Sequence, residues 1–273
     1  MGFPFVKMEG CANDFVVVYA ADLPPDAGPA LAASLCDRRL GVGADGVLII
    51  GTDDLPPGVL ASMTVWNADG SIPEMCGNGL RCVVVRLVED ARMTGDQARI
   101  LTGAGVLTAR WADGEVSVDM GPPRLEGTRR VLGIEGTDVS MGNPHFVVFA
   151  DGHDALPDLT EWGPGLEVDP AFPQRTNVEW ATLEAPDRIR LRVWERGVGE
   201  TQACGTGACA TAVAAMQTGR TALREVQVHL PGGRLAVHWA GAGQPVIMTG
   251  PARTVFSGHW RPAVQRPSAR EAT

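Results

Sequence analysis

Short apolar runs, each flanked by turn residues, recur along the chain. They lie at residues 16–19, 47–50, 63–66 and 189–193. Their length and their flanks are typical of β-strands. Asp113-Gly114 and the Pro-Gly-Gly run at residues 231–233 predict hairpin turns.

Two other stretches have the spacing of helices. After residue 76, apolar residues recur three and four positions apart from residue 80 to residue 88, and Gly95 can end the helix. After residue 204, the same spacing runs from residue 208 to residue 216, with Gly219 as the stop. The second helix is rich in alanine, so it can pack closely against neighbouring backbone. Strands and helices are therefore mixed in each half of the chain.

The second half of the chain repeats the first. VWNADGSIPEMCGNG begins at Val65, and VWERGVGETQACGTG begins at Val193. Before these segments ANDFVVV is matched by GNPHFVVF, after them LTGAGVLTARW is matched by LPGGRLAVHW, and each half closes on Gly-Pro. Four landmarks in the same order indicate two homologous domains, at residues 1–122 and 132–251. Residues 261–273 lack periodicity and predict a loose tail.

Composition and charge exclude several classes of partner. The chain has 273 residues, with 45% hydrophobic and 20% charged residues, as in a soluble globular protein. Its net charge is −9, and no run of Lys or Arg forms a basic stripe, so neither nucleic acid nor an anionic membrane surface is expected as a partner. A small anionic substrate stays possible, because local dipoles can outweigh a distant net charge. The chain has neither a signal-peptide pattern nor an apolar run of membrane-spanning length, which predicts a cytoplasmic protein.

The six cysteines are expected to be reduced in that compartment. They are Cys11, Cys36, Cys76, Cys82, Cys204 and Cys209. No C-x-x-C pair occurs and no histidine has zinc-finger spacing, so we expect no metal site. Cys82 and Cys209 lie inside the predicted helices, where a cysteine is usually a small buried hydrophobe.

Cys76 and Cys204 each stand directly before a glycine-rich turn and a helix. The first turn of a helix has unpaired N–H groups and the positive end of the helix dipole. A thiol there is expected to have its pKa lowered from about 8.5 towards neutrality, and a carboxylate can dock onto the uncovered N–H groups. A single Cys-Gly-x-Gly is more often structural. Two of them facing each other across a domain junction would place a thiol on each side of one ligand.

Two opposed thiols suggest one reaction above others. One thiolate removes the proton from a carbon next to a carboxylate, and the opposite thiol returns a proton to the other face, so the stereocentre inverts. The helix N-termini would stabilise the negative charge that develops on the carboxylate. Neither a PLP-type lysine motif nor a metal cluster is evident, so the reaction is expected to need no cofactor.

Four segments carry a resemblance to a known family. They are NADGSIPEMCGNG (67–79), GNPHFVV (142–148), RTNVEW (175–180) and WERGVGETQACGTGA (194–208). These segments resemble the signatures of diaminopimelate epimerases, and the likeness extends from residue 7 to residue 258. It implies an α/β fold of the α+β type, with two pseudo-symmetric domains, each a barrel-like sheet around a central helix. It also implies an active site at the domain junction and a final strand, about residues 252–260, that returns to the first domain.

The resemblance implies a role for each matching residue. Cys76 and Cys204 would be the acid/base thiols, with His145 and Glu195 modulating their ionisation. The reacting carboxylate would be held by Gly77, Asn78, Gly205 and Thr206. The rest of the substrate would be bound by Asn13, Asn67, Asn143, Asn177, Glu195 and Arg196. The implied reaction converts LL-2,6-diaminopimelate to the meso form without a cofactor, in lysine and peptidoglycan precursor biosynthesis. A homodimer is an open expectation, since the sequence leaves the oligomeric state undecided.

Two positions depart from a common form of the family pattern. Glu9 stands where histidine is frequent, and Gly46 stands where some members have a substrate-contacting glutamine. The nearest alternative is a cofactor-independent racemase of histidine or proline on the same scaffold. A phenazine-type isomerase is disfavoured because both cysteines are present. A thiol redox protein would explain the cysteines but not the asparagines or Arg196, and a purely binding protein has no use for two activated thiols.

Overall fold

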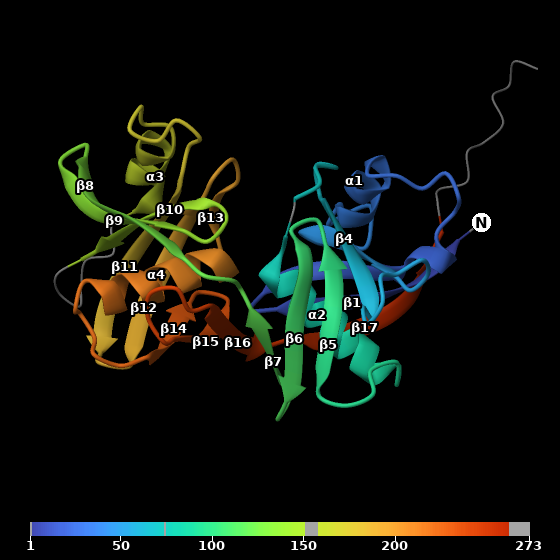
Figure 1. Cartoon of the computed structure of the whole chain (residues 1–273). Coiled ribbons are helices and arrows are strands. Elements are labelled where there is room, and N and C mark those ends of the chain that lie inside the picture. The colour runs from blue at the N-terminus through green and yellow to red at the C-terminus, as the bar shows by residue number, and fades with distance from the viewer. Residues whose placement is uncertain (1, 74, 151–157, 262–273) are drawn as a thin grey trace, which may run out of the picture.

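The computed structural model describes residues 2–73, 75–150 and 158–261, and it forms two lobes side by side (Figure 1). The predicted tail lies outside the described residues except for Arg261. The first lobe is built from β1 (Phe3–Gly10), β2 (Asn13–Tyr19), the 3-10 helix η1 (Ala20–Asp22), α1 (Ala30–Cys36), β3 (Gly46–Gly51), β4 (Ala61–Asn67), α2 (Gly77–Glu89), β5 (Gln97–Thr102), β6 (Gly105–Ala112) and β7 (Glu115–Asp119).

The second lobe contains β8 (Arg124–Val131), β9 (Ile134–Ser140), β10 (Pro144–Phe149), α3 (Leu159–Glu167), β11 (Asn177–Ala185), β12 (Arg188–Glu195), β13 (Gly199–Thr201), α4 (Gly205–Gln217), β14 (Glu225–Leu230), β15 (Gly233–Trp239) and β16 (Val246–Pro251). From β9 onwards it has the same order of main strands and helices as the first lobe, with one additional short strand, β13, and β8 precedes this repeated part. The last strand, β17 (Arg253–Trp260), leaves the second lobe.

Strand pairing follows the same pattern in both lobes. In the first, β1–β2 is antiparallel, β2–β3 parallel, β3–β4 antiparallel and β4–β5 parallel, followed by two antiparallel pairs, β5–β6 and β6–β7. In the second, β9, β10, β11, β12, β14, β15 and β16 pair in the same succession. The predicted α/β fold of two similar halves is confirmed.

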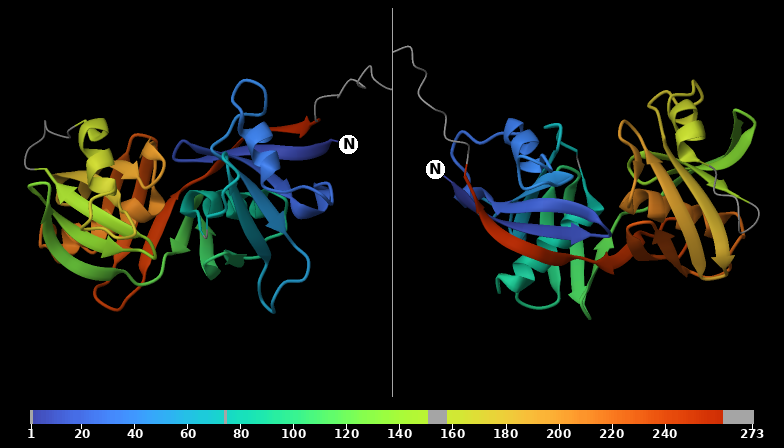
Figure 2. Two further views of the ribbon diagram at one scale, coloured as in Figure 1. Left: turned by 90° about the horizontal axis from the view of Figure 1, so that it is seen from above. Right: turned by 180° about the vertical axis from the view of Figure 1, so that it is seen from behind.

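Two strand pairs join the lobes. β16 pairs antiparallel with β7, and β17 then runs antiparallel to β1, from Phe3 opposite Trp260 to Glu9 opposite Arg253. Figure 2 shows β17 crossing from the second lobe to lie along the first strand of the chain. The junction between the lobes is therefore made of hydrogen-bonded sheet and not of a flexible linker.

Each lobe wraps its sheet around one helix. Residues 77–85 of α2 and residues 207–216 of α4 are buried without a break. A helix that is buried on all sides is usually small or apolar all round. α4 meets this demand, whereas α2 also buries Asn78 and Arg81, both of which form hydrogen bonds. The two helices also contact each other at the junction.

The predicted strands and both hairpin turns are confirmed. Asp113 and Gly114 take φ of 54° and 82°, as a two-residue hairpin turn requires. α4 ends close to the predicted stop, with Gly219 at φ 72°. The predicted stop of α2 at Gly95 is wrong, because the helix already ends at Glu89. Ala91 takes the left-handed conformation there (φ 54°), and the turn is closed by bonds back to the carbonyl of Leu87.

None of the helices in the described part of the chain has the length and hydropathy of a bilayer span.

Candidate functional site

Cys76 and Cys204 occupy the same place in the two lobes. Each is the N-cap of its buried helix and has extended backbone, with φ −140° and ψ 106° at Cys76 and φ −126° and ψ 112° at Cys204. The backbone N–H of Gly79 donates to Cys76 Sγ at 3.3 Å. Cys204 Sγ lies 3.6 Å from the hydroxyl of Thr206. Cys76 Sγ thus accepts from an N–H group of a helix N-terminus, whereas Cys204 Sγ contacts a side chain of the first turn of its helix.

The two helix N-termini lie against each other. The side-chain amide of Asn78 donates to the carbonyl of Ala203, the residue before Cys204, at 3.3 Å. A Cβ on Gly77 would lie 3.0 Å from Met248 Cε, and one on Gly205 would lie 3.1 Å from Met248 Sδ. The side chain of Met248 therefore packs against both turns, and a side chain at either glycine would require it to shift.

Burial raises the pKa of both thiols, so the predicted fall towards neutrality is wrong for this structure. The pKa of Cys76 is raised to about 11 by burial, although the backbone N–H groups of Gly79 and Asn78 act in the opposite direction. Burial raises the pKa of Cys204 well above its usual value, and the carboxylates of Glu195 and Glu179 add to the rise. Desolvation outweighs the helix N-terminus here because it acts on the whole charge of a thiolate.

Strand register gathers three predicted residues of the second lobe at one sheet end. His145 of β10 lies opposite Asn177 of β11, and the next residue along β11 lies opposite Trp194 of β12, which precedes Glu195. Asn177 donates from its amide to the carbonyl of Pro144 at 2.8 Å and accepts from the backbone N–H of Arg196 at 3.0 Å. Asn177 thereby ties the end of β12 to the start of β10.

Glu195 and Arg196 do not pair with each other. Glu195 accepts a hydrogen bond from the hydroxyl of Thr201 at 2.5 Å, and Arg196 Nη1 donates to the carbonyl of Gln174 at 2.8 Å. The Arg196 side chain is exposed, whereas Glu195 is half-buried and raises the pKa of both Cys76 and Cys204. Glu195 is thus the charged residue that both thiols share.

The equivalent edge of the first lobe contains Asn13, Gly46 and Asn67. Gly46 lies opposite Asn67, and the strand that bears Asn13 runs parallel to β3. The Asn67 amide donates to Ser71 Oγ at 2.9 Å, which keeps it in the turn after β4. Asn13 accepts from the Asn78 amide at 3.1 Å and donates to Asp45 at 2.8 Å. Asn13 is thereby connected to the N-terminus of α2.

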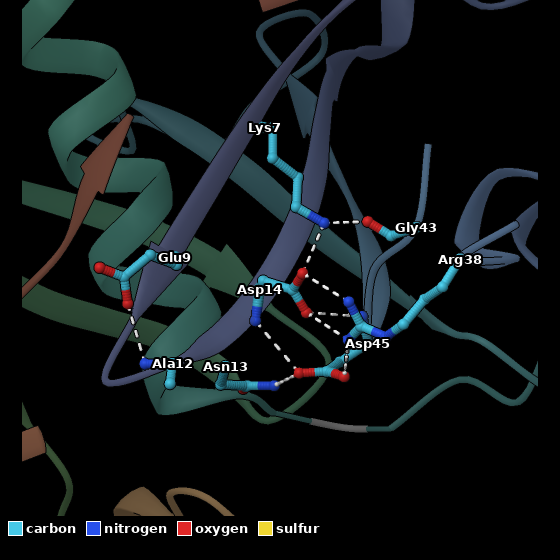
Figure 3. A network of polar contacts seen from close by, with 8 residues as sticks. All are labelled: Lys7, Glu9, Ala12, Asn13, Asp14, Arg38, Gly43 and Asp45. Atoms are coloured by element: carbon cyan, nitrogen blue, oxygen red, sulfur yellow. Dashed lines mark hydrogen bonds and ion pairs between the residues drawn. The ribbon is translucent and has the colours of Figure 1, made fainter. Parts of the chain in front are cut away.

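A network of charged residues holds Asn13 in place (Figure 3). Arg38 bridges Asp14 and Asp45 at 2.8 and 2.7 Å, and Lys7 pairs with Asp14 at 2.6 Å. Burial alone would raise the pKa of Asp14, but hydrogen bonds from Arg38 and Lys7 hold it well below its usual range. Asp45 is a site residue that sequence reasoning missed. Its one signal was its position directly before a predicted strand.

A buried histidine–glutamate pair lies behind α4. His145 Nδ1 is 2.6 Å from Glu179 Oε1, and both side chains are 0% exposed. Glu179 was also missed, although it lies inside the segment RTNVEW. A Cβ on Gly207 would come within 2.8 Å of Glu179 Oε1, so the carboxylate sits directly below the first turn of α4.

Another missed residue, Arg81, is fully buried one turn into α2. Its Nε donates to the carbonyl of Pro251 at 3.1 Å and its Nη2 contacts Cys11 Sγ at 3.6 Å. The charge of Arg81 lowers the pKa of Cys76 to a smaller extent than burial raises it. The first lobe therefore has a buried cation near its thiol.

The two departures from the family pattern have structural roles. Glu9 accepts from the backbone N–H of Ala12 at 2.8 Å and pairs with Arg253 at 2.5 Å, which ties the β1–β2 turn to β17. A Cβ on Gly46 would lie 2.9 Å from the carbonyl of Trp66, so this backbone has no room for a side chain.

All six cysteines are free in the structure, and Cys82 and Cys209 are fully buried. Over the ranges that the structure describes, no group of His, Cys, Asp and Glu side chains is arranged to hold a metal ion.

Comparison with known proteins points to one family. The family model described as diaminopimelate epimerase matches residues 5–126 and 137–255. The chain is similar to diaminopimelate epimerase of Desulforudis audaxviator, with 48% identity covering 94% of this chain and 98% of the relative. It is also similar to the diaminopimelate epimerase of Pseudomonas aeruginosa, with 44% identity over 94% of this chain and 98% of the relative.

Solved structures share the fold at low sequence identity. A PhzF-family phenazine biosynthesis protein of Bacillus anthracis superposes with a TM-score of 0.75 at 14% identity, covering 96% of this chain and 99% of the other. A hydroxyproline epimerase from Agrobacterium vitis gives a TM-score of 0.67 at 14% identity, covering 94% and 92%. At such identities the likeness concerns the fold alone.

Proposed function

This chain belongs to the diaminopimelate epimerase family, and we propose that Cys76 and Cys204 are the two thiols between which its reaction runs. The reaction interconverts LL- and meso-diaminopimelate, as an isomerase step of lysine biosynthesis. The observation that supports these two residues is their identical position, as N-caps of two buried helices whose N-termini lie against each other.

The proposed mechanism uses one thiol as a base and the other as an acid. The base removes the proton from the α-carbon, and the acid on the opposite face delivers a proton, which inverts the stereocentre. The substrate carboxylate docks onto the N–H groups of Gly77, Asn78, Gly205 and Thr206. These donors stabilise the charge that moves onto the carboxylate as the α-proton leaves. Neither thiol needs a cofactor for this exchange.

His145 and Glu195 are proposed to set the ionisation of the thiols. Because burial keeps both thiols protonated near neutral pH, one of them must lose its proton before turnover. The Glu195 carboxylate raises the pKa of both thiols, so it favours the state with at most one thiolate. The site therefore favours one thiolate, which acts as the base, and one protonated thiol, which acts as the acid, over two thiolates.

The distal amino-acid end of the substrate is proposed to be bound by polar groups around the junction. They are Asn13, Asn67, Asn143, Asn177, Glu195 and Arg196. Amides supply both donors and acceptors, which a paired ammonium and carboxylate require. Arg196 donates only one of its N–H groups to Gln174 among the described contacts, and its planar fork suits a second carboxylate.

Solvent deuterium incorporation tests the proposal. Purified protein in D₂O with LL-diaminopimelate and no added cofactor is expected to incorporate deuterium at the α-carbon while meso product forms, as followed by proton NMR. Activity should survive dialysis against a chelator and treatment with a carbonyl reagent. Loss of activity that only PLP or a metal ion restores would overturn the proposed chemistry.

Oxidation tests whether the two thiols lie close together. Mild oxidation is expected to inactivate the enzyme by joining Cys76 to Cys204, and a dithiol reductant should restore it, because two thiols around one small ligand can reach bonding distance when the site is empty. Mass spectrometry of the oxidised protein should identify this bridge. Inactivation with both thiols still free would contradict the prediction.

Three further proposals concern the domain bounds, the cellular location and the assembly of the protein. We propose domains at residues 1–122, completed by the strand at about 252–260, and at residues 132–251. The net charge of −9 supports a small-molecule enzyme of the cytoplasm that binds neither nucleic acid nor membrane. Val255 and Phe256 of β17 are 53% and 47% exposed, and this apolar surface supports a homodimer, which light scattering after size-exclusion chromatography would detect.

A further inference from the structure

A continuous chain of side-chain hydrogen bonds runs from the core of the second lobe to Cys204. Glu179 Oε1 lies 2.6 Å from His145 Nδ1, and His145 Nε2 lies 2.9 Å from Asn143 Oδ1. The Asn143 amide nitrogen lies 3.4 Å from Thr206 Oγ1, which lies 3.6 Å from Cys204 Sγ. This chain of hydrogen bonds therefore starts at the Glu179 carboxylate below α4 and ends at Cys204, one of the two proposed catalytic thiols.

From His145 Nε2 onwards, every donor in this chain points towards the sulfur. The carbonyl oxygen of the Asn143 amide can only accept, so His145 Nε2 carries the hydrogen between them. The Asn143 amide nitrogen can only donate, so Thr206 Oγ1 accepts from it. The hydroxyl hydrogen of Thr206 is then free to point at Cys204, where it stabilises a thiolate.

The direction of the chain depends on Glu179. One proton is shared between Glu179 Oε1 and His145 Nδ1, and Nε2 keeps its hydrogen whichever of the two groups holds that proton. If the shared proton is lost, the imidazole of His145 keeps a single N–H hydrogen. The Glu179 carboxylate accepts a hydrogen bond from it at Nδ1, so Nε2 has no hydrogen left to donate to Asn143. Burial raises the pKa of Glu179, which favours retention of the shared proton, although the charge of His145 acts in the opposite direction.

The fold itself does not require a polar pair at these positions. Strand register places Phe15 and Leu48 in the first lobe where the second has His145 and Glu179. A Cβ on Gly79 would lie 2.8 Å from Leu48 Cδ2, just as one on Gly207 would lie 2.8 Å from Glu179 Oε1. An apolar pair therefore supports the same helix in the same way below Cys76.

We propose that Glu179 is a positioning residue which, through His145, Asn143 and Thr206, holds a hydroxyl donor on Cys204 and so makes its thiolate accessible. Cys76 does not depend on this chain, since its donor is the backbone N–H of Gly79. The charged groups that act on Cys204 are Glu195 from β12 and Glu179 from β11, and His145 from β10 balances the latter. The inference rests on the proposed function of Cys204 and adds a residue to it.

The test measures the reactivity of both thiols in one sample without substrate. A small neutral alkylating agent, iodoacetamide, is applied between pH 7 and pH 10, and the modification rates of Cys204 and Cys76 are read by mass spectrometry. The ratio of the two rates cancels any change in access that both thiols share. In Glu179→Leu this ratio is expected to fall about tenfold, the size expected for a hydrogen bond to a charged group. Glu179→Gln should keep the ratio within about twofold of wild type, because its amide can donate to His145 Nδ1 as a protonated carboxyl does.

Two further variants make the test independent of folding failure. The double variant His145→Phe with Glu179→Leu installs the pair that the first lobe already uses, and it should fold and show the same fall. Asp138→Asn removes another buried carboxylate of the second lobe, one that pairs with Arg129 and lies outside the chain, and its ratio should stay within about twofold of wild type.

A folded double variant with an unchanged ratio would overturn the proposal, and so would an equal fall in Asp138→Asn. Turnover of LL-diaminopimelate gives the second measurement, with kcat expected to fall about tenfold in Glu179→Leu and KM to stay nearly constant. Failure of wild type to turn over diaminopimelate would reject the proposed function while leaving the alkylation ratio as a separate result.

Discussion

Cys76→Ala and Cys204→Ala are each expected to lose epimerase activity by roughly 10³-fold or more. An enzyme with one thiol can remove a proton or return one, but it cannot do both on opposite faces of a carbon. The measurement is kcat/KM for LL-diaminopimelate, with circular dichroism to show that the fold is kept. Each variant should still bind the substrate, because the N–H groups of the helix N-termini belong to the backbone.

Cys82→Ala and Cys209→Ala are the matched controls. Both residues are fully buried inside the same helices, so their replacement should cost about 1 to 3 kcal/mol of the free energy of unfolding and little activity. Thermal unfolding reports the first effect and steady-state kinetics the second. Equal loss of activity at all four positions would mean that the cysteines have been assigned to the wrong roles.

Substrate selection is expected to be the second large effect, with kcat/KM for LL-diaminopimelate exceeding that for L-lysine by as much as roughly 10⁴-fold. L-lysine lacks the distal carboxylate and therefore cannot accept the two parallel hydrogen bonds that the Arg196 guanidinium can donate. Arg196→Lys should therefore lose most of this discrimination, because a single ammonium cannot reproduce the two parallel bonds of a guanidinium.

Arg175→Lys is the control for this second effect. Arg175 is a neighbouring exposed arginine that pairs with Glu167 at 3.4 Å, and its change should leave the discrimination intact. L-histidine and L-proline complete the comparison. If any of the three amino acids is turned over as well as diaminopimelate, the distal contacts are wrongly assigned and a simpler racemase activity takes their place.

The features that the sequence predicts well are those encoded locally and repeated. A cysteine before a glycine-rich turn and an apolar helical run defines an N-cap wherever it occurs, and the second copy after Val193 confirms the pattern of the first. The short β-strands and the turn at Asp113-Gly114 are likewise set by neighbouring residues. Local sequence patterns are therefore sufficient to place both thiols and both central helices.

Features that depend on distant residues could not be derived in this way. Glu179 stands in a strand where alternation alone would allow it to face solvent, and only the register with β10 places it beside His145. The raised pKa values of the thiols follow from burial in the folded protein, which no local pattern contains. The early end of α2 at Glu89 depends on a left-handed conformation at Ala91, which residue preferences argue against.

β17 has a consequence for how the protein is made. β1 is paired on one side with β2 and on the other with β17, although almost the entire chain separates the two outer partners. During synthesis on the ribosome, one edge of β1 stays unpaired until residue 260 has emerged. Most residues of the first lobe have been synthesised long before that point. An open edge can template pairing with other chains, and pairing over such a sequence distance is slow. The lobe that carries Cys76 is thus translated first and completed last. Until β17 has been synthesised, the nascent chain depends on protection of the open edge of β1 from pairing with other chains.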